Sequence, residues 1–503
     1  MTDPSGRRHG TDIGSSKRLG YRFSPKRPLS QAEPLSPVVH VLALTVLIPV
    51  TLIAIALLPI NLMWSLVPVV GLPALTASIL LITIILYGVP WIAYLLIAQQ
   101  DRPPYSTFGP PSIARLVPFL PLAPVRCLKV IKATSQYLRA CAGFTKIAYY
   151  WVLKYVHVSR MQANAIPICD SIPYAIPFSR QKLDVYPACA PATPQSDESN
   201  EPYGLGIQCG APVLVFVPTT VPPVAVTSCR KAYLQLALSL QKLGYCVVVP
   251  DISYYPHVRI RQSVIDLRLA LSWVGAHISS YGGDPARIHV MGFGMSALLV
   301  LLMLVQEAVV LSGTLLMNCA HENGTAPADA TKQGAVAATK RPVSLRNLEI
   351  YAPQIRLPQL AGVILLAGIS DVVKKYRTEM ERGVEHLSLL RRFTGPSHAQ
   401  CMLHSPLHLL MQSHGMLDAS FLPRKFLLIH GGRDTVVPLS HSSLLKTQLN
   451  AAGIKHVDLR AYRDLGHTET LTCLFAIPTR AQPSYARNIL TDIHAFLSNK
   501  SNS

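Results

Sequence analysis

The sequence predicts an α/β fold, in which a doubly wound, mainly parallel sheet follows an N-terminal transmembrane helical hairpin. Two observations support this prediction. From Pro34 to Gln100 the chain contains no Asp, Glu, Lys or Arg, and this length suits two spans of about 20 residues with a short connection. From about Asp170 onward, short apolar runs alternate with helical segments, which is typical of parallel sheets covered by helices.

The uncharged stretch is expected to form spans near Val38–Leu58 and Ala74–Ile97, with Pro59, Gly71 and Pro73 marking the turn. Half of the 503 residues are apolar and only 14% are charged, which is below the usual quarter for soluble domains. A cleaved signal peptide would begin earlier and be shorter. A hairpin buried in a protein core is the remaining alternative.

Basic residues flank this hairpin on both sides and supply much of the net charge of +20. The positive-inside rule then places both ends in the cytosol. We therefore expect an integral membrane protein of the endoplasmic reticulum or another endomembrane, with its large domain facing the cytosol. Membrane lipids are the expected partners of this charge, and nucleic acid is not, because no nucleic-acid-binding signature accompanies it.

The ten cysteines are scattered singly between Cys127 and Cys473, without a CxxC pair or a Cys/His cluster at metal-ligand spacing. This pattern is typical of a reduced chain and predicts no metal site and no disulfide scaffold. We also expect no cofactor. The glycosylation sequon Asn323–Thr325 can be used only if the domain is luminal.

A helix is expected within Val125–Arg160, with basic residues along one side and apolar residues on an adjoining face. This helix either lies on the membrane surface or packs over the globular domain, and the sequence leaves both open.

The chain divides into four predicted regions. They are a disordered basic tail (1–33), the hairpin (34–100), a basic amphipathic juxtamembrane segment (101–165) and the α/β domain (166–500), with insertions near 188–210 and 318–346.

The α/β domain is predicted from its short apolar runs and the helical segments between them. Strands are expected at 183–186, 213–217, 246–250, 288–292, 362–366, 426–430 and 457–461, and helices at 234–243, 264–277, 297–305 and 485–498.

The segment Tyr281–Leu299 reads YGGDPARIHVMGFGMSALL and carries the most information about chemistry. A strand leads into Gly292–Ser296, and a helix follows. This is the strand–turn–helix context of the nucleophile elbow, G-x-S-x-G, in which a serine is exposed at the end of a sheet.

With further motifs in the same order and spacing, the chain resembles the α/β-hydrolase superfamily over about residues 170–500. Within it, the chain resembles membrane-bound prenylcysteine methylesterases and related carboxylesterases. The motifs are KLDVY at Lys182–Tyr186, D-x-x-x-A-L-x-W at Asp266–Trp273, GGDPARI at Gly282–Ile288, ERGVEHLS at Glu381–Ser388, HGGRDTVVP at His430–Pro438 and GHT at Gly466–Thr468.

This resemblance implies a catalytic triad with Asp434 as the acid and His467 as the base. The nucleophile position, the third residue of the elbow, is Gly294. Because glycine has no side chain, no acyl-enzyme can form there. Ser296 lies two residues later, on the first turn of the helix, where we expect its side chain to point away from His467.

The oxyanion region is altered as well. The family carries His-Gly-Gly after the strand 213–217, and its backbone N–H groups face the tetrahedral intermediate. This chain has Pro218 followed by Thr219 and Thr220. Proline lacks the N–H, and threonine adds a Cβ where the backbone must approach closely. The Met295 N–H, just after the elbow, remains a candidate donor.

Three functions remain open from the sequence. The first is a catalytically impaired hydrolase homologue on a membrane, which binds a lipidic or prenylated ligand or a protein partner. The second is an active carboxylic ester hydrolase that uses an unconventional nucleophile such as Ser296. The third is a structural or scaffolding membrane protein. Because the triad lacks its nucleophile, Asp434 and His467 can also be ordinary structural residues. Particular protein partners cannot be named from the sequence.

Overall fold

The computed structural model describes residues 37–97, 121–139, 169–175, 181–188, 209–219, 229–255, 257–322, 345, 348–395, 397–475 and 484–498. Within these residues, eight strands form one sheet in the order β1-β2-β4-β3-β5-β6-β7-β8. The strands are β1 (Cys169–Pro173), β2 (Lys182–Tyr186), β3 (Ala211–Val217), β4 (Cys246–Pro250), β5 (Gly283–Phe293), β6 (Leu360–Leu366), β7 (Lys425–Gly431) and β8 (His456–Tyr462).

The sheet is mixed, because β1 pairs with β2, and β2 with β4, in antiparallel register, whereas β4, β3, β5, β6, β7 and β8 are parallel. The prediction of an α/β fold with a mainly parallel sheet is confirmed. The predicted strands are all present, and β1 is an additional strand at the edge. Because the chain leaves β3 for β4 on one side and later adds β5 on the other, the sheet has a topological switch point at the carboxyl ends of β3 and β5.

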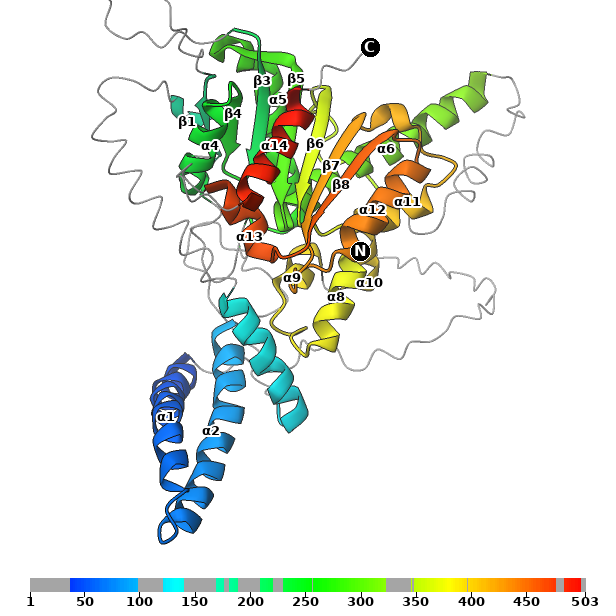
Figure 1. Ribbon diagram of the computed structural model, residues 1–503. Coiled ribbons are helices and arrows are strands. Elements are labelled where there is room, and N and C mark those ends of the chain that lie inside the picture. The colour runs from blue at the N-terminus through cyan, green and yellow to red at the C-terminus, as the bar shows by residue number, and fades with distance from the viewer. Residues whose placement is uncertain are drawn as a thin grey trace, which may run out of the picture.

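Helices cover both faces of the sheet (Figure 1). Alternate residues of β3 show why: Val213, Val215 and Val217 belong to one buried cluster, and Leu214 and Phe216 to the other. The first cluster packs under α5 (Ile260–His277), α6 (Met295–Glu322), α11 (Pro406–Gln412) and α12 (Ser440–Ala451), and the second under α4 (Leu234–Gln241) and α14 (Ser484–Ser498).

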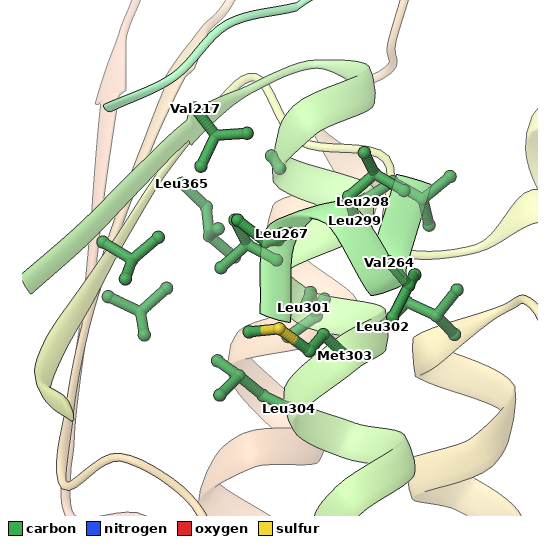
Figure 2. Packing of buried hydrophobic residues seen from close by; sticks show 14 of the residues in the cluster. Val217, Val264, Leu267, Leu298, Leu299, Leu301, Leu302, Met303, Leu304 and Leu365 are labelled. Carbon is green, nitrogen blue, oxygen red and sulfur yellow. The ribbon is translucent and has the colours of Figure 1, made fainter. Parts of the chain in front are cut away.

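Helix α6 follows the elbow and is a core helix (Figure 2). Its stretch Met295–Leu316 is long and apolar enough to cross a membrane, but 78% of its most apolar window is buried inside the protein. Leu298, Leu301 and Leu302 are at most 1% exposed among the residues of α5 and the sheet. Its apolar character is therefore explained by packing inside the domain.

Two long apolar helices precede the domain, α1 (Pro37–Trp64) and α2 (Gly71–Ile97). They pack against each other as a hairpin that projects away from the sheet (Figure 1). Both are long and apolar enough to cross a membrane, and most of their side chains are not covered by protein. The turn lies at 65–70, so the expectation that Pro59 marks it is wrong, since Pro59 lies inside α1.

Close contacts hold the hairpin together. The Asn61 side chain donates to the Ala74 carbonyl oxygen at 2.6 Å and to the Ser78 hydroxyl at 3.0 Å. Farther along, a Cβ on Gly88 would collide with the Thr51 side chain. Small residues at such a crossing let two apolar helices approach closely.

The part of the predicted juxtamembrane helix that the structure describes is helical over 124–139. It packs on the segment that follows α8 (Val372–Glu381): Arg126 pairs with Glu385 at 2.5 Å, and Arg382 donates to Gln136 Oε1 at 2.5 Å. Packing over the domain is thus observed for this part. Leu128 and Leu138 stay exposed, and contact of that face with a membrane stays a prediction.

Some predictions fall outside the described residues: the basic tail 1–33, the remainder of 125–160, and most of both insertions. Helix α6 continues to Glu322, five residues into the stretch predicted as an insertion from Asn318. Six further helices among the described residues were not predicted: α8, α9 (Leu389–Thr394), α10 (His398–Leu403), α11, α12 and the short α13 (His467–Thr472).

Candidate functional site

The carboxyl ends of the central parallel strands bring three predicted residues together. Gly294 follows β5, Asp434 follows β7, and His467 begins α13 after β8. Because β5, β6, β7 and β8 are neighbours in parallel register, their ends share one edge of the sheet. This is the edge at which ligand sites form in open α/β sheets.

The elbow keeps its tight turn around a glycine. Gly294 has φ of +56°, a left-handed conformation that favours glycine, and its N–H donates to the Leu366 carbonyl oxygen at 2.9 Å. At Gly292, a Cβ would lie 2.8 Å from the Ala297 nitrogen. The strand therefore enters α6 through a turn that only a residue without a side chain can occupy at 292.

His467 faces the position where the elbow would carry a nucleophile. A Cβ on Gly294 would lie 3.5 Å from His467 Nε2 and 3.7 Å from Cε1, which is ordinary van der Waals contact. The ring also packs on Phe293, with 4.8 Å between ring centroids. The imidazole edge therefore points at Gly294 with room for a small side chain.

Asp434 holds the other nitrogen of this ring. His467 Nδ1 lies 2.7 Å from Asp434 Oδ2, and Asp434 Oδ1 accepts from the N–H groups of Val436 and Val437 at 2.8 Å each. The Asp434 side chain is fully buried. Burial alone would raise its pKa, but the rings of His467 and His430 hold the pKa of this carboxyl well below its usual range. An ionised Asp434 keeps the proton on Nδ1 and leaves the Nε2 lone pair toward Gly294.

His430, at the end of β7, is a site residue that sequence reasoning did not identify. Its Nε2 lies 2.9 Å from the Val437 carbonyl oxygen and 3.4 Å from Asp434 Oδ2, and its Nδ1 lies 2.8 Å from the Ser442 hydroxyl. It therefore lies close to the same carboxylate oxygen as His467 and supports Asp434. Its position four residues before Asp434 in HGGRDTVVP is the only signal that the sequence offers for this role.

Ser296 is fully buried, and its hydroxyl is used by the elbow backbone. The Phe293 N–H donates to Ser296 Oγ at 2.9 Å, and Ser296 Oγ donates to the Phe293 carbonyl oxygen at 3.0 Å. Its only proton is thus committed to the backbone. This geometry gives Ser296 a role in closing the turn, with its hydroxyl bonded to Phe293.

The oxyanion side retains one well-placed candidate. Thr219 is buried, and its N–H donates to the Tyr233 hydroxyl at 3.4 Å, while Thr220 lies outside the described residues. The Pro218 carbonyl oxygen accepts from Tyr254 at 2.6 Å. Met295 is the first residue of α6, where backbone N–H groups have no partner inside the helix. Its N–H is therefore a candidate donor beside Gly294.

No metal site is found among the described residues, since no three His, Cys, Asp or Glu side chains there gather as ligands. The groups that the described residues bring together beside Gly294 are a carboxylate, an imidazole and one helix N-terminus. Such a set can move a proton at a bound carbonyl compound, but it contains no covalent nucleophile.

Comparisons with known proteins relate part of the chain to esterases. Residues 262–342 match the carboxylesterase family. A probable carboxylic ester hydrolase, LipM, from Mycobacterium tuberculosis is 42% identical over 53 residues, which are 10% of this chain and 12% of that protein. These matches support a relationship of this part of the chain to α/β-hydrolase esterases. Residues 262–342 contain the elbow, most of α5 and all of α6.

Solved structures with a similar arrangement include esterase B from Lactobacillus rhamnosis and esterase 2 from Thermogutta terrifontis with bound butyrate. The first is 14% identical with a TM-score of 0.43 and covers 71% of this chain and 96% of its own. The second is 16% identical with a TM-score of 0.38 and covers 67% and 96%. At these values the likeness supports no argument about substrate or activity.

Proposed function

We propose that this chain is a membrane-anchored carboxylesterase-like protein that binds a lipidic ester, of the prenylcysteine methyl ester or a related class, and forms no acyl-enzyme. The acid and base of a hydrolase are kept in working geometry, and the covalent nucleophile is missing. Without that nucleophile, the protein is impaired in the usual two-step ester hydrolysis. A purely structural role for the domain is the competing interpretation.

The relation between Gly294 and His467 is the observation that supports this proposal. The imidazole faces a glycine across ordinary contact distance, and its other nitrogen is fixed by a buried carboxylate. A site with a purely structural role has no need for a partly exposed histidine on a fully buried, ionised partner, because burying a charge is costly. The pair is therefore better explained by ligand chemistry than by packing.

The length of α2 supports the membrane anchor. Its 27 residues extend about 40 Å, whereas the hydrocarbon core of a bilayer is about 30 Å thick. A span that begins at Gly71 would leave the hydrocarbon near Trp91. Tyr87 and Trp91 there donate to the carbonyl oxygens of Leu122 and Pro121 at 3.0 and 3.1 Å. Aromatic side chains with one polar end are typical of the membrane interface.

Contacts above this level connect the hairpin to the site. Tyr94, in the last turns of α2, is buried against Val130 and Leu387. Arg382 lies five residues before Leu387, in the segment that follows α8. It donates to Gln136 and to the carbonyl oxygen of Thr435, the residue next to Asp434. In Figure 1, α9 and α13 lie at the end of the sheet nearest to the hairpin. A ligand whose tail stays in the bilayer would thus meet the site with its polar end.

Labelling with a fluorophosphonate tests the proposal, because this probe marks only an activated serine. The full chain in detergent micelles should not be labelled, whereas Gly294→Ser should be, since its hydroxyl would lie beside His467 Nε2. Gly294→Ala is the matched control for the changed backbone. Adding His467→Gln to Gly294→Ser should remove the label.

Two results would contradict the proposal. Labelling of the unchanged chain, mapped to a serine at this site, would show that a covalent nucleophile exists. If Gly294→Ser folds but is never labelled, the acid–base pair is not in working geometry, and the structural role is favoured. A shift in melting temperature of the full chain with a prenylcysteine methyl ester, absent in His467→Gln, would support ligand binding.

A further inference from the structure

We propose that His467 activates a water molecule directly, so that this site hydrolyses an ester without an acyl-enzyme intermediate. This inference rests on the proposed function in that it assumes an ester-binding site without a covalent nucleophile. It goes further, because it assigns the site a hydrolytic activity of its own. The position of attack is the space beside Gly294 where a serine hydroxyl would otherwise stand.

The base is prepared for this step. Nδ1 of His467 is paired with Asp434, so the imidazole presents the lone pair of Nε2. Within the described part of the chain, Nδ1 is the one ring nitrogen of His467 for which a hydrogen-bond partner is found. The side chain is 13% exposed. Nε2 can therefore accept a proton from a molecule that arrives from solvent.

The space at Gly294 is suited to a water molecule. A Cβ there would touch the ring at 3.5 Å without collision. With hydrogen in place of the side chain, a water oxygen can approach Nε2 to about 2.8 Å, the usual length of such a hydrogen bond. Ser296 does not compete for the same proton acceptor, because its hydroxyl is bonded to Phe293. Among the described residues, no hydroxyl or thiol is found beside His467 Nε2 at Gly294, and water is the nucleophile that we propose there.

The step balances without any further reactant. The water oxygen forms a bond to the ester carbonyl carbon while one of its protons passes to His467 Nε2. The carbonyl oxygen becomes an oxyanion, and the Met295 N–H is the candidate donor to it. The tetrahedral species then collapses with cleavage of the bond to the alkoxy oxygen, which takes the proton back from Nε2. The products are a carboxylic acid and an alcohol, and His467 is neutral again.

The expected rate is modest. General base catalysis alone contributes about 10²- to 10⁴-fold over the uncatalysed reaction. Esters with good leaving groups should therefore be hydrolysed measurably, and no enzyme-bound acyl group should accumulate.

Hydrolysis of p-nitrophenyl butyrate by the full chain in detergent micelles tests this inference. The unchanged chain should exceed the background by about a hundredfold or more, without an initial burst and without fluorophosphonate labelling. His467→Gln should fall to the background. Gly294→Ala should lose at least tenfold, because its methyl group occupies the place of the water. Gly294→Ser should become sensitive to the fluorophosphonate.

A second measurement guards against misfolded variants. Imidazole added in solution should raise the rate of His467→Gly above the rate that the same imidazole gives without protein, and a misfolded protein would not produce this excess. Turnover of the unchanged chain that equals the background, or that persists in His467→Gln, would overturn the inference. Without labelling, that result leaves the proposed function standing. Labelling of the unchanged chain would instead overturn the proposed function itself.

Discussion

His430 and His467 both approach the same carboxylate oxygen: His467 Nδ1 lies 2.7 Å and His430 Nε2 lies 3.4 Å from Asp434 Oδ2. The acid of this site is therefore held by two imidazoles and two backbone N–H groups. Substitutions of His430 can therefore show whether it acts on His467 through Asp434 or only packs.

We expect His430→Leu to weaken the acid–base pair. Without the His430 ring, Asp434 loses one of the groups that keep its pKa low, and a buried carboxylate loses a hydrogen-bond donor. In the Gly294→Ser background, the rate of fluorophosphonate labelling should fall about tenfold. His430→Gln, whose amide can donate from a similar position, should keep more of the rate. Equal losses in both variants would show that His430 only packs.

Gly294→Ala should destabilise the full chain by about 1 kcal/mol, because a side chain at φ of +56° is strained. Gly210→Ala is the matched control, since Gly210 has φ of +73° and nothing within 4 Å of an added Cβ. The two variants should lower the unfolding midpoint about equally in detergent micelles. A much larger loss at Gly294 would mean that the space beside His467 is smaller than the structure shows.

Stability should fall as the pH drops from about 6.5 to about 4. Burial lowers the pKa of His289, His404 and His441 from 6.5 to about 4. Between these values the unfolded chain binds more protons than the folded chain, so folding becomes less favourable with acid. Each group contributes up to about 3 kcal/mol, which is present above pH 6.5 and lost toward pH 4.

Thermal unfolding midpoints of the full chain between pH 4 and 8 check this expectation. His441→Gln should flatten the acid side of the curve, because its buried side chain no longer titrates. The control His456→Gln removes an exposed ring on β8 and should follow the unchanged chain. If His441→Gln kept the full slope, burial of this histidine would not be a source of the acid sensitivity.

Arg382→Met should loosen the helix at 124–139. Arg382 donates at 2.9 Å to the Thr435 carbonyl oxygen and also bonds Gln136, and burial lowers its pKa. Without these bonds, limited proteolysis should cut within 124–139 several-fold faster. Arg377→Met, an exposed position on α8, is the control and should leave the rate unchanged. Equal rates in both variants would mean that Arg382 does not tie this helix to the domain.

The membrane prediction has its own test. Expressed with microsomes, the chain should resist extraction at alkaline pH, because α1 and α2 are each long enough to span a bilayer. The sequon at Asn323 should remain unmodified if the domain faces the cytosol, so Asn323→Gln should cause no change in mass. A glycan at Asn323 would reverse the predicted orientation, and complete extraction would favour a hairpin buried against protein.

Most strands could be predicted because buried parallel strands are short apolar runs such as CVVVP at Cys246–Pro250. β1 was missed because CDSIP has too few apolar residues to form such a run. Helices of six or seven residues, such as α9 and α11, were missed because two turns are too short to show a helical period. The extent of α6 was underestimated, because the helix continues past the apolar run 297–305 and its following Gln306 and Glu307 as far as Glu322.

The sequence by itself determined that the elbow has no nucleophile, since a glycine at 294 has no side chain in any fold. It also identified Asp434 and His467 as candidates, through motifs that lie at strand ends. Only the tertiary structure decided that His467 faces Gly294, that His430 supports Asp434, and that the Ser296 hydroxyl is used by the backbone. The physical reason is that Gly294 and His467 belong to distant parts of the chain. Their separation is set by the register of β5 to β8 and by side-chain packing, which no local pattern encodes.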